Sequence, residues 1–197
     1  MIHTVHLDKV AGQPWRNGGG STRELLAWPS VADWRLRISV ATIAQGGPFS
    51  AFPGVERWFA VVQGEGVVLR FANRRVMLTT GSDPVRFEGA AAPGCDLLDG
   101  TTQDLNLMVR HDAGKGAMQR AAAGEEWVSP AALRAVFTMT PATLQIDDAD
   151  VAALPAGTLA WSDNAAHQRW RLVTVGRDGR DGTEARAWTL QLKPFPT

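Results

Sequence analysis

Residues 47–66 have the sequence GPFSAFPGVERWFAVVQGEG, in which a turn-rich lead precedes a strand-like segment and a Gly-x-Gly turn. The same layout recurs along the chain, where short strand-like segments alternate with Gly and Pro clusters. These segments cover residues 34–41, 57–63, 67–71, 76–80, 104–110, 170–175 and 187–192. Many short strands with frequent turns predict an all-β sandwich or barrel. Only residues 129–134 are helix-like, and they amount to one or two turns.

A boundary between two parts is expected near residues 112–129, where Gly114-Lys115-Gly116 and a run of alanines interrupt the strands. We therefore predict one β-barrel in residues 1–112, which carries the ligand pocket, and a smaller one in residues 113–197. Terminal strands could be shared between the two. Residues 176–182 have the composition of an exposed hairpin tip.

Composition excludes several classes of protein. The 197 residues include 20 basic and 20 acidic side chains, so the net charge is zero, and 45% of the residues are hydrophobic. A neutral chain lacks the basic surface that nucleic acids and anionic membranes attract, so neither is an expected partner. A single cysteine, Cys95, excludes an intramolecular disulfide and a thiolate metal cluster. No secretory signal or membrane-length apolar run is visible, and we expect a cytoplasmic protein.

The first candidate for a ligand loop is PWRNGGGSTRE, residues 14–24. Asn17-Gly18 favours a tight hairpin turn, and consecutive glycines let the backbone approach a ligand closely. In the functional interpretation Arg16 and Asn17 contact the ligand, because an Arg fork suits a carboxylate. The alternative is a plain hairpin in which Trp15 fills the core.

The second candidate is the strand at residues 104–110. Alternation places Asp104, Asn106, Met108 and Arg110 on one face. In an ordinary sandwich this polar face meets water. In a small ligand-holding barrel it lines the interior instead. The four histidines are scattered without ligand-like spacing, and we predict structural or surface roles for them.

Together these segments resemble the HutD/Ves family of bacterial cupin-type proteins. The resemblance rests on residues 14–25, 34–41, 47–57 and 97–108, with PWRNGGGSTREL and DLNLM as its specific strings. It implies a bicupin fold: two jelly-roll-like β-barrels in one chain, the second smaller and degenerate. It also implies a protein that binds a small metabolite and modulates histidine utilisation, without a settled catalytic activity. Ves-like members lie outside that pathway, so the resemblance leaves the ligand open.

The resemblance also bears on metals. In metal-binding cupins, the stretch matching residues 47–66 supplies two histidines and a glutamate. This chain has Phe52 and Val55 in that neighbourhood and Arg57 where the glutamate would stand. A guanidinium has no lone pair to donate, so we predict no metal and no other cofactor. Arg57 is either a solvent-facing strand residue or an inward cation that binds an anion.

The sequence thus predicts a metal-free bicupin that binds an organic anion such as urocanate or formylglutamate. Competing hypotheses are a metal-free enzyme with Asp104 or Glu24 as general base, an ordinary metallocupin, and a structural or partner-binding barrel. Pairing of two copies through an edge strand is left open. No catalytic residue is assigned, and the predicted ligand-binding residues are Trp15, Arg16, Asn17, Gly18, Gly19, Glu24, Phe52, Arg57, Asp104, Asn106 and Met108.

Overall fold

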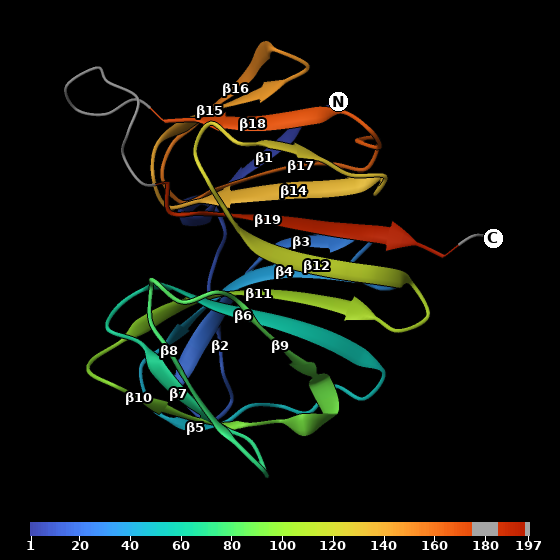
Figure 1. Cartoon of the computed structure of the whole chain (residues 1–197). Coiled ribbons are helices and arrows are strands. Elements are labelled where there is room, and N and C mark those ends of the chain that lie inside the picture. The colour runs from blue at the N-terminus through green and yellow to red at the C-terminus, as the bar shows by residue number, and fades with distance from the viewer. Residues whose placement is uncertain (175–184, 196–197) are drawn as a thin grey trace. The chain divides into compact units, whose positions relative to one another are not determined.

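The fold is built almost entirely of β-strands, as the alternating segments predict (Figure 1). The computed structural model describes residues 1–174 and 185–195. Helical geometry among them is limited to two single 3-10 turns, η1 (Leu7–Lys9) and η2 (Gly89–Ala91). Residues 129–134, expected to be helix-like, instead lead into a strand. No helix in these ranges is long and apolar enough to cross a membrane. The predicted hairpin tip at residues 176–182 falls outside the described residues.

The chain divides into two compact units. We call residues Val10–Gly114 the N-terminal unit, and Met1–Lys9 with Lys115–Thr197 the C-terminal unit. The observed boundary at residue 114 is close to the expected one at 112. The first nine residues, however, belong with the C-terminal part of the chain. The prediction counted them in residues 1–112 but left open that terminal strands are shared between the two barrels.

The N-terminal strand explains that difference. Strand β1 (His3–His6) pairs antiparallel with β17 (Thr158–Ser162), and the His3 ring stacks on Trp161 with 4.4 Å between centroids. The Leu7 amide continues the contact by donating to the Gly157 carbonyl at 2.8 Å. Since a four-residue strand with three polar side chains has little sequence signal, its partner could not be predicted.

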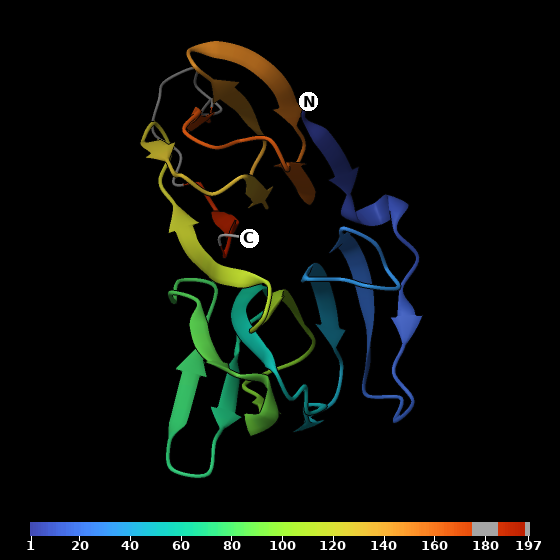
Figure 2. The ribbon, with the colours of Figure 1, turned by 90° about the vertical axis from the view of Figure 1, so that its right-hand side faces the viewer.

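The N-terminal unit contains two antiparallel sheets. In Figure 2 its blue strands β2 and β3 and its green hairpin β7–β8 lie on opposite sides of the unit. The larger sheet has the order β2 (Gln13–Pro14), β3 (Gly20–Trp28), β4 (Leu36–Ile43), β11 (Thr102–Arg110), β6 (Val55–Gln63), β9 (Val85–Glu88). The smaller has the order β5 (Gly47–Pro48), β10 (Gly94–Leu97), β7 (Val67–Arg70), β8 (Arg75–Leu78). Their shared core includes Phe59, Val61, Leu69 and Phe87.

The C-terminal unit also has two sheets. One has the order β1, β17, β14 (Leu133–Thr138), β19 (Ala187–Pro194), β12 (Gly114–Ala121). The other has the order β13 (Glu126–Val128), β18 (Arg169–Val173), β15 (Ala142–Ile146), β16 (Ala149–Leu154). The fully buried Trp170 belongs to its core.

The two units repeat one strand order. In the N-terminal unit β4-β11-β6-β9 faces β5-β10-β7-β8, and in the C-terminal unit β12-β19-β14-β17 and β13-β18-β15-β16 follow the same sequence. Each strand therefore has a counterpart eight strands later. This repetition is compatible with the expectation of two related barrels, and it lets positions in one unit be compared with positions in the other.

The hairpin between β2 and β3 supplies a stability test. A Cβ at Gly20 would overlap the Thr42 carbonyl oxygen and press on the Trp15 ring. We expect Gly20→Ala to lower the free energy of unfolding by about 1–3 kcal/mol, as overpacking does. Gly47→Ala is the control, because a Cβ there meets nothing within 4 Å. Chemical denaturation measures both, and equal stabilities of the two variants would contradict the close approach at Gly20.

Candidate functional site

The N-terminal unit encloses a cavity of about 570 Å³ on the inner face of its larger sheet. Strand register builds this face: Arg37 and Arg57 flank Met108 in one row, and Ser39 and Phe59 flank Asn106 in the next. The side chains that line the cavity come from β2 and its turn, from β3, β4, β6 and β11, and from β5 with the segment after it. They are Gln13, Pro14, Trp15, Arg16, Asn17, Thr22, Arg37, Ser39, Ala41, Ile43, Pro48, Phe49, Ser50, Phe52, Arg57, Phe59, Asn106 and Met108.

Arg57 is the most unusual of these side chains. It is only 7% exposed, and its Nη2 donates to Asn106 Oδ1 at 3.0 Å. Its Nε and Nη1 are buried without any hydrogen-bond partner. Three aromatic rings surround the guanidinium, with centroids 5.2 Å (Phe49), 5.6 Å (Phe52) and 5.2 Å (Phe87) from Cζ. The group therefore has aromatic contacts on several sides but most of its donors unused.

The charge of Arg57 is not balanced by the protein. No acidic side chain of the described ranges forms an ion pair with it, and the charged neighbour that acts on it is a second cation, Arg37. Burial, and then the Arg37 charge, lower the pKa of Arg57 to about 10, so it is still protonated near neutral pH. Arg37 differs, because its Nε lies 2.6 Å from Glu24 Oε2. The cavity wall thus carries one uncompensated buried cation beside a neutralised one.

The turn after β2 forms the far end of the cavity. The Trp15 amide donates to the Gly20 carbonyl at 2.9 Å, and Trp15 Nε1 donates to Thr22 Oγ1 at 2.8 Å. Asn17 Oδ1 accepts from the Gly19 amide at 3.0 Å, while Gly18 adopts a φ of 72°. These bonds fix Trp15 as a wall and leave the exposed Arg16 at the cavity edge.

Asp104 is in phase with Asn106 and Met108 but does not reach the cavity. It is fully buried, its Oδ2 accepts from Thr102 Oγ1 at 2.7 Å, and its Oδ1 has no partner. Burial raises its pKa to about 7, against the opposing effect of the Thr102 bond. Cys95 is also buried; desolvation first, and then the Asp104 and Asp96 charges, raise the pKa of its thiol to about 12.

The structure brings seven of the predicted ligand-binding residues to this one cavity: Trp15, Arg16, Asn17, Phe52, Arg57, Asn106 and Met108. The other four, Gly18, Gly19, Glu24 and Asp104, do not line it. Glu24 is held by Arg37, and the Gly19 amide is used by Asn17 within the turn. Sequence reasoning missed Arg37, Ser39 and Phe49. The period of two in residues 36–43 could have placed Arg37 and Ser39 on the inner face.

The residues at the position of the cupin metal do not fit a metal ion. Phe52 and Val55 have no donor atoms, and Arg57 is a buried cation. Within residues 1–174 and 185–195, no three His, Cys, Asp or Glu side chains gather in a way that could hold an ion.

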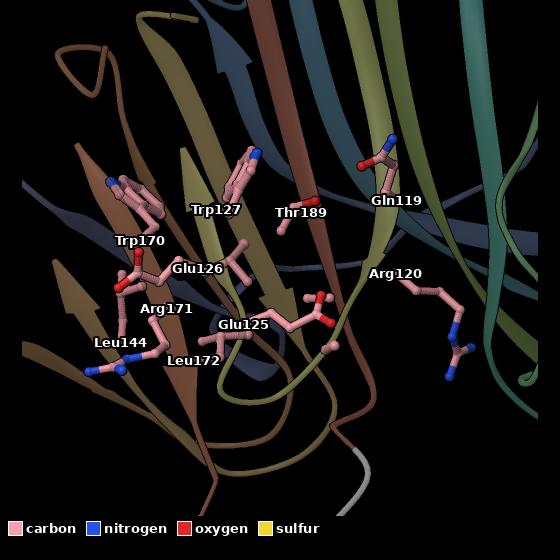
Figure 3. A pocket seen from close by; sticks show the side chains of 13 residues that line it. Gln119, Arg120, Glu125, Glu126, Trp127, Leu144, Trp170, Arg171, Leu172 and Thr189 are labelled. Atoms are coloured by element: carbon pink, nitrogen blue, oxygen red, sulfur yellow. The ribbon is translucent and has the colours of Figure 1, made fainter. Parts of the chain in front are cut away.

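The C-terminal unit has a smaller cavity of about 170 Å³. In Figure 3, Trp127 and Trp170 lie on one side, Gln119 and Arg120 on the other, and Thr189 and Glu125 between them. The two cavities involve corresponding strands, because β19 and β14 carry Thr189 and Val136 as β11 and β6 carry Asn106 and Phe59.

Arg134 lies on β14, the strand that corresponds to β6 with Arg57. It is fully buried, and its Cζ lies 4.1 Å from the Trp127 ring centroid and 4.9 Å from that of Trp170. Unlike Arg57, it donates to three backbone carbonyls, those of Trp127, Ala165 and Gln168. The protein thus supplies backbone acceptors to both terminal nitrogens of Arg134, and only its Nε is buried without a partner.

Comparison with known proteins shows the family to which the chain belongs. A family model described as HutD matches residues 8–177. The chain belongs to the HutD family. Protein Ves from Citrobacter koseri is 38% identical over 107 residues, 53% of this chain and 56% of that protein. An uncharacterized 21.2 kDa protein in the hutC 3' region of Pseudomonas putida is 34% identical over 97 residues, 48% of this chain and 51% of that protein. The matches thus span about half the length of these curated HutD-family relatives.

Solved structures support the fold. HutD from Pseudomonas fluorescens SBW25 superposes with a TM-score of 0.83 at 23% identity, covering 100% of both chains. Oxalate decarboxylase from Bacillus subtilis, a cupin, has a TM-score of 0.61 at 10% identity over 97% of this chain and 77% of that chain. The predicted HutD/Ves membership and the all-β, cupin-like fold are therefore confirmed.

The buried carboxyl of Asp104 yields a pH prediction. Its folded-state pKa is about 7, well above the ordinary value of 3.8. The folded protein therefore keeps a proton that the unfolded chain releases, so this group lowers stability as pH rises from about 4 to about 7. We expect the stability of Asp104→Asn relative to wild type to increase over that range, by up to about 4 kcal/mol at about 1.4 kcal/mol per pKa unit.

Denaturation at a series of pH values measures this difference. Asp99→Asn, at an exposed carboxyl of the same unit, is the control. A difference between Asp104→Asn and wild type that does not change with pH would contradict the proton held at Asp104.

Proposed function

We propose that the N-terminal unit binds a small organic anion, with a carboxylate on Arg57, and thereby modulates histidine utilisation. The observation that carries the proposal is the buried Arg57 guanidinium, which has no counter-ion and two unpartnered nitrogens at a cavity wall. An uncompensated buried charge is costly. A ligand carboxylate would supply both the missing charge and the missing acceptors.

The hydrogen-bonding capacity of Arg57 favours a two-oxygen acceptor. A guanidinium has two forks, and its Nη2 contributes one hydrogen to each. Asn106 Oδ1 occupies one of those hydrogens. The second fork, completed by a nitrogen that the protein does not use, suits a carboxylate in bidentate geometry. Asn106 is itself oriented, because its Nδ2 donates to the Asp104 carbonyl at 3.2 Å.

Cavity size and the relatives narrow the ligand class. A volume of about 570 Å³ is in the range of small-molecule sites. The Pseudomonas putida relative is named for its position in the hutC 3' region, and the Pseudomonas fluorescens structure is named HutD. These names favour acids of histidine breakdown, such as urocanate or formylglutamate, as candidates.

The competing hypotheses receive less support. An enzyme would use Asp104 or Glu24 as a base, but neither lines the cavity, and Glu24 is paired with Arg37. A purely structural barrel would leave the Arg16–Asn17 turn apart from Arg57, whereas all three line one cavity.

Removal of the Arg57 charge tests the proposal. Titration calorimetry with urocanate and formylglutamate should show binding to the wild type and at least about thirty-fold weaker binding to Arg57→Gln, the effect of losing 2 kcal/mol or more. Arg74→Gln, an equal charge change in an exposed turn, should bind as the wild type does. Without ligand, Arg57→Gln should be no less stable, because it removes a buried charge that lacks a partner. Binding unaffected by Arg57→Gln would overturn the proposal.

Fluorescence provides an independent readout. Of the eight tryptophans, Trp15 lines the cavity. The ligand should quench a minority of the tryptophan emission, and Trp15→Phe should abolish most of that change while calorimetry still shows binding. If the ligand still quenches the emission of Trp15→Phe, the ligand does not contact Trp15.

A further inference from the structure

We infer that the ligand is an elongated dianion, with one carboxylate on Arg57 and a second anionic group on Arg16 at the other end of the cavity. The inference rests on the proposed binding of an anion at Arg57 and adds the charge and length of that ligand. Of the two candidates named above, it favours formylglutamate, a dicarboxylate, over urocanate, a monocarboxylate.

Two cations on this cavity wall lack an acidic partner within the described residues. Arg57 is the buried one, and Arg16 is the exposed one, for whose guanidinium those residues supply neither an ion pair nor a hydrogen bond. Arg37 also lines the cavity, but Glu24 neutralises it at 2.6 Å. A ligand with a single carboxylate on Arg57 would leave Arg16 without an ion pair, whereas a second anionic group on the ligand would form one with Arg16.

The two cations lie toward opposite ends of the sheet face. Arg57 shares its row with Arg37 across Met108. The turn that carries Arg16 closes at Gly20, which pairs with Ile43. Arg37 and Ile43 are six residues apart on β4, and at roughly 3.3 Å per residue the two rows are about 20 Å apart. The Arg57 guanidinium reaches the Asn106 row, and Arg16 lines the cavity from the turn at the other end, so a ligand that joins them must be extended.

The wall between the two ends suits the body of such a ligand. Ala41, Ile43, Phe49 and Phe59 provide apolar surface along the cavity, and Ser39 places one hydroxyl beside Asn106. A mainly apolar chain between two charged ends matches this lining, because the polar contacts concentrate where the charges would lie.

The two ends should contribute unequally. Arg57 is desolvated, so loss of its charge should nearly abolish binding. Arg16 is exposed, and exposed ion pairs contribute up to about 1 kcal/mol, which corresponds to about five-fold in affinity. The contribution of Arg16 should also weaken as salt is added, since surface pairs are screened.

The test compares monocarboxylates and dicarboxylates of equal chain length: hexanoate with adipate, and octanoate with suberate. Titration of the wild-type protein should give about two- to five-fold tighter binding of the dicarboxylate in at least the longer pair. Arg16→Gln should erase this preference, because it should weaken dicarboxylate binding by more than it weakens monocarboxylate binding. Arg74→Gln, an equal charge change outside the cavity, should preserve the preference.

The outcomes separate the two proposals. If monocarboxylates bind through Arg57 but dicarboxylates gain nothing, or if the gain survives Arg16→Gln, the dianion inference is overturned and anion binding at Arg57 stands. If neither these acids nor urocanate or formylglutamate bind to the folded wild type, the proposed function itself fails, and the inference fails with it.

Discussion

The buried and uncompensated charge of Arg57 is the constraint around which the N-terminal unit is arranged. Desolvation of a cation is expensive, and here no carboxylate offsets it. Three rings from two places converge on the guanidinium: Phe49 and Phe52 from the segment between β5 and β6, and Phe87 from β9. Aromatic contacts of this kind recover part of the cost, each about 0.5–2 kcal/mol. The remaining cost is what a bound anion would relieve, so the same interaction links the packing of the cavity to its chemistry.

The C-terminal unit shows how the fold supplies backbone acceptors to a buried arginine on the corresponding strand, β14. Arg134 lies on the corresponding strand, β14, packs on two tryptophans, and donates to three carbonyls. Its cavity is about 170 Å³, against about 570 Å³ around Arg57. Around Arg134, where the backbone supplies acceptors, the space for a ligand is small. Around Arg57, where the backbone supplies none, the space is large and two nitrogens have no partner. Arg57 keeps two buried nitrogens without a partner and Arg134 keeps one, and this difference between two corresponding strands supports a ligand role for the open donors of Arg57.

Much of this arrangement could be predicted from local patterns, and the remainder depended on long-range pairing. The period of two in residues 104–110 placed Asn106 and Met108 on one face, but only closure of the two sheets decides whether that face meets water or a cavity. Asp104 follows the same period but is buried outside the cavity. Whether a residue of this face lines the cavity depends on which side chains cover its row. The sequence also left open whether Arg57 faces solvent or the interior. Its pairing with Phe87 and Met108 places it on the inner face. Pairing of β1 with β17 spans about 150 residues, which no local signal encodes.

The positions of the two carboxyl groups nearest the site bear on what happens to a bound anion. A general base must lie within hydrogen-bond reach of the proton that it removes. Asp104 is enclosed beneath the cavity wall with one oxygen held by Thr102, and its raised pKa keeps it largely protonated below neutral pH. Glu24 is engaged by Arg37 and does not line the cavity. The donors of Arg57 can fix a carboxylate, but neither acid is placed to move a proton on it. This arrangement supports the proposed binding of an anion at Arg57 without a role for either acid as its general base.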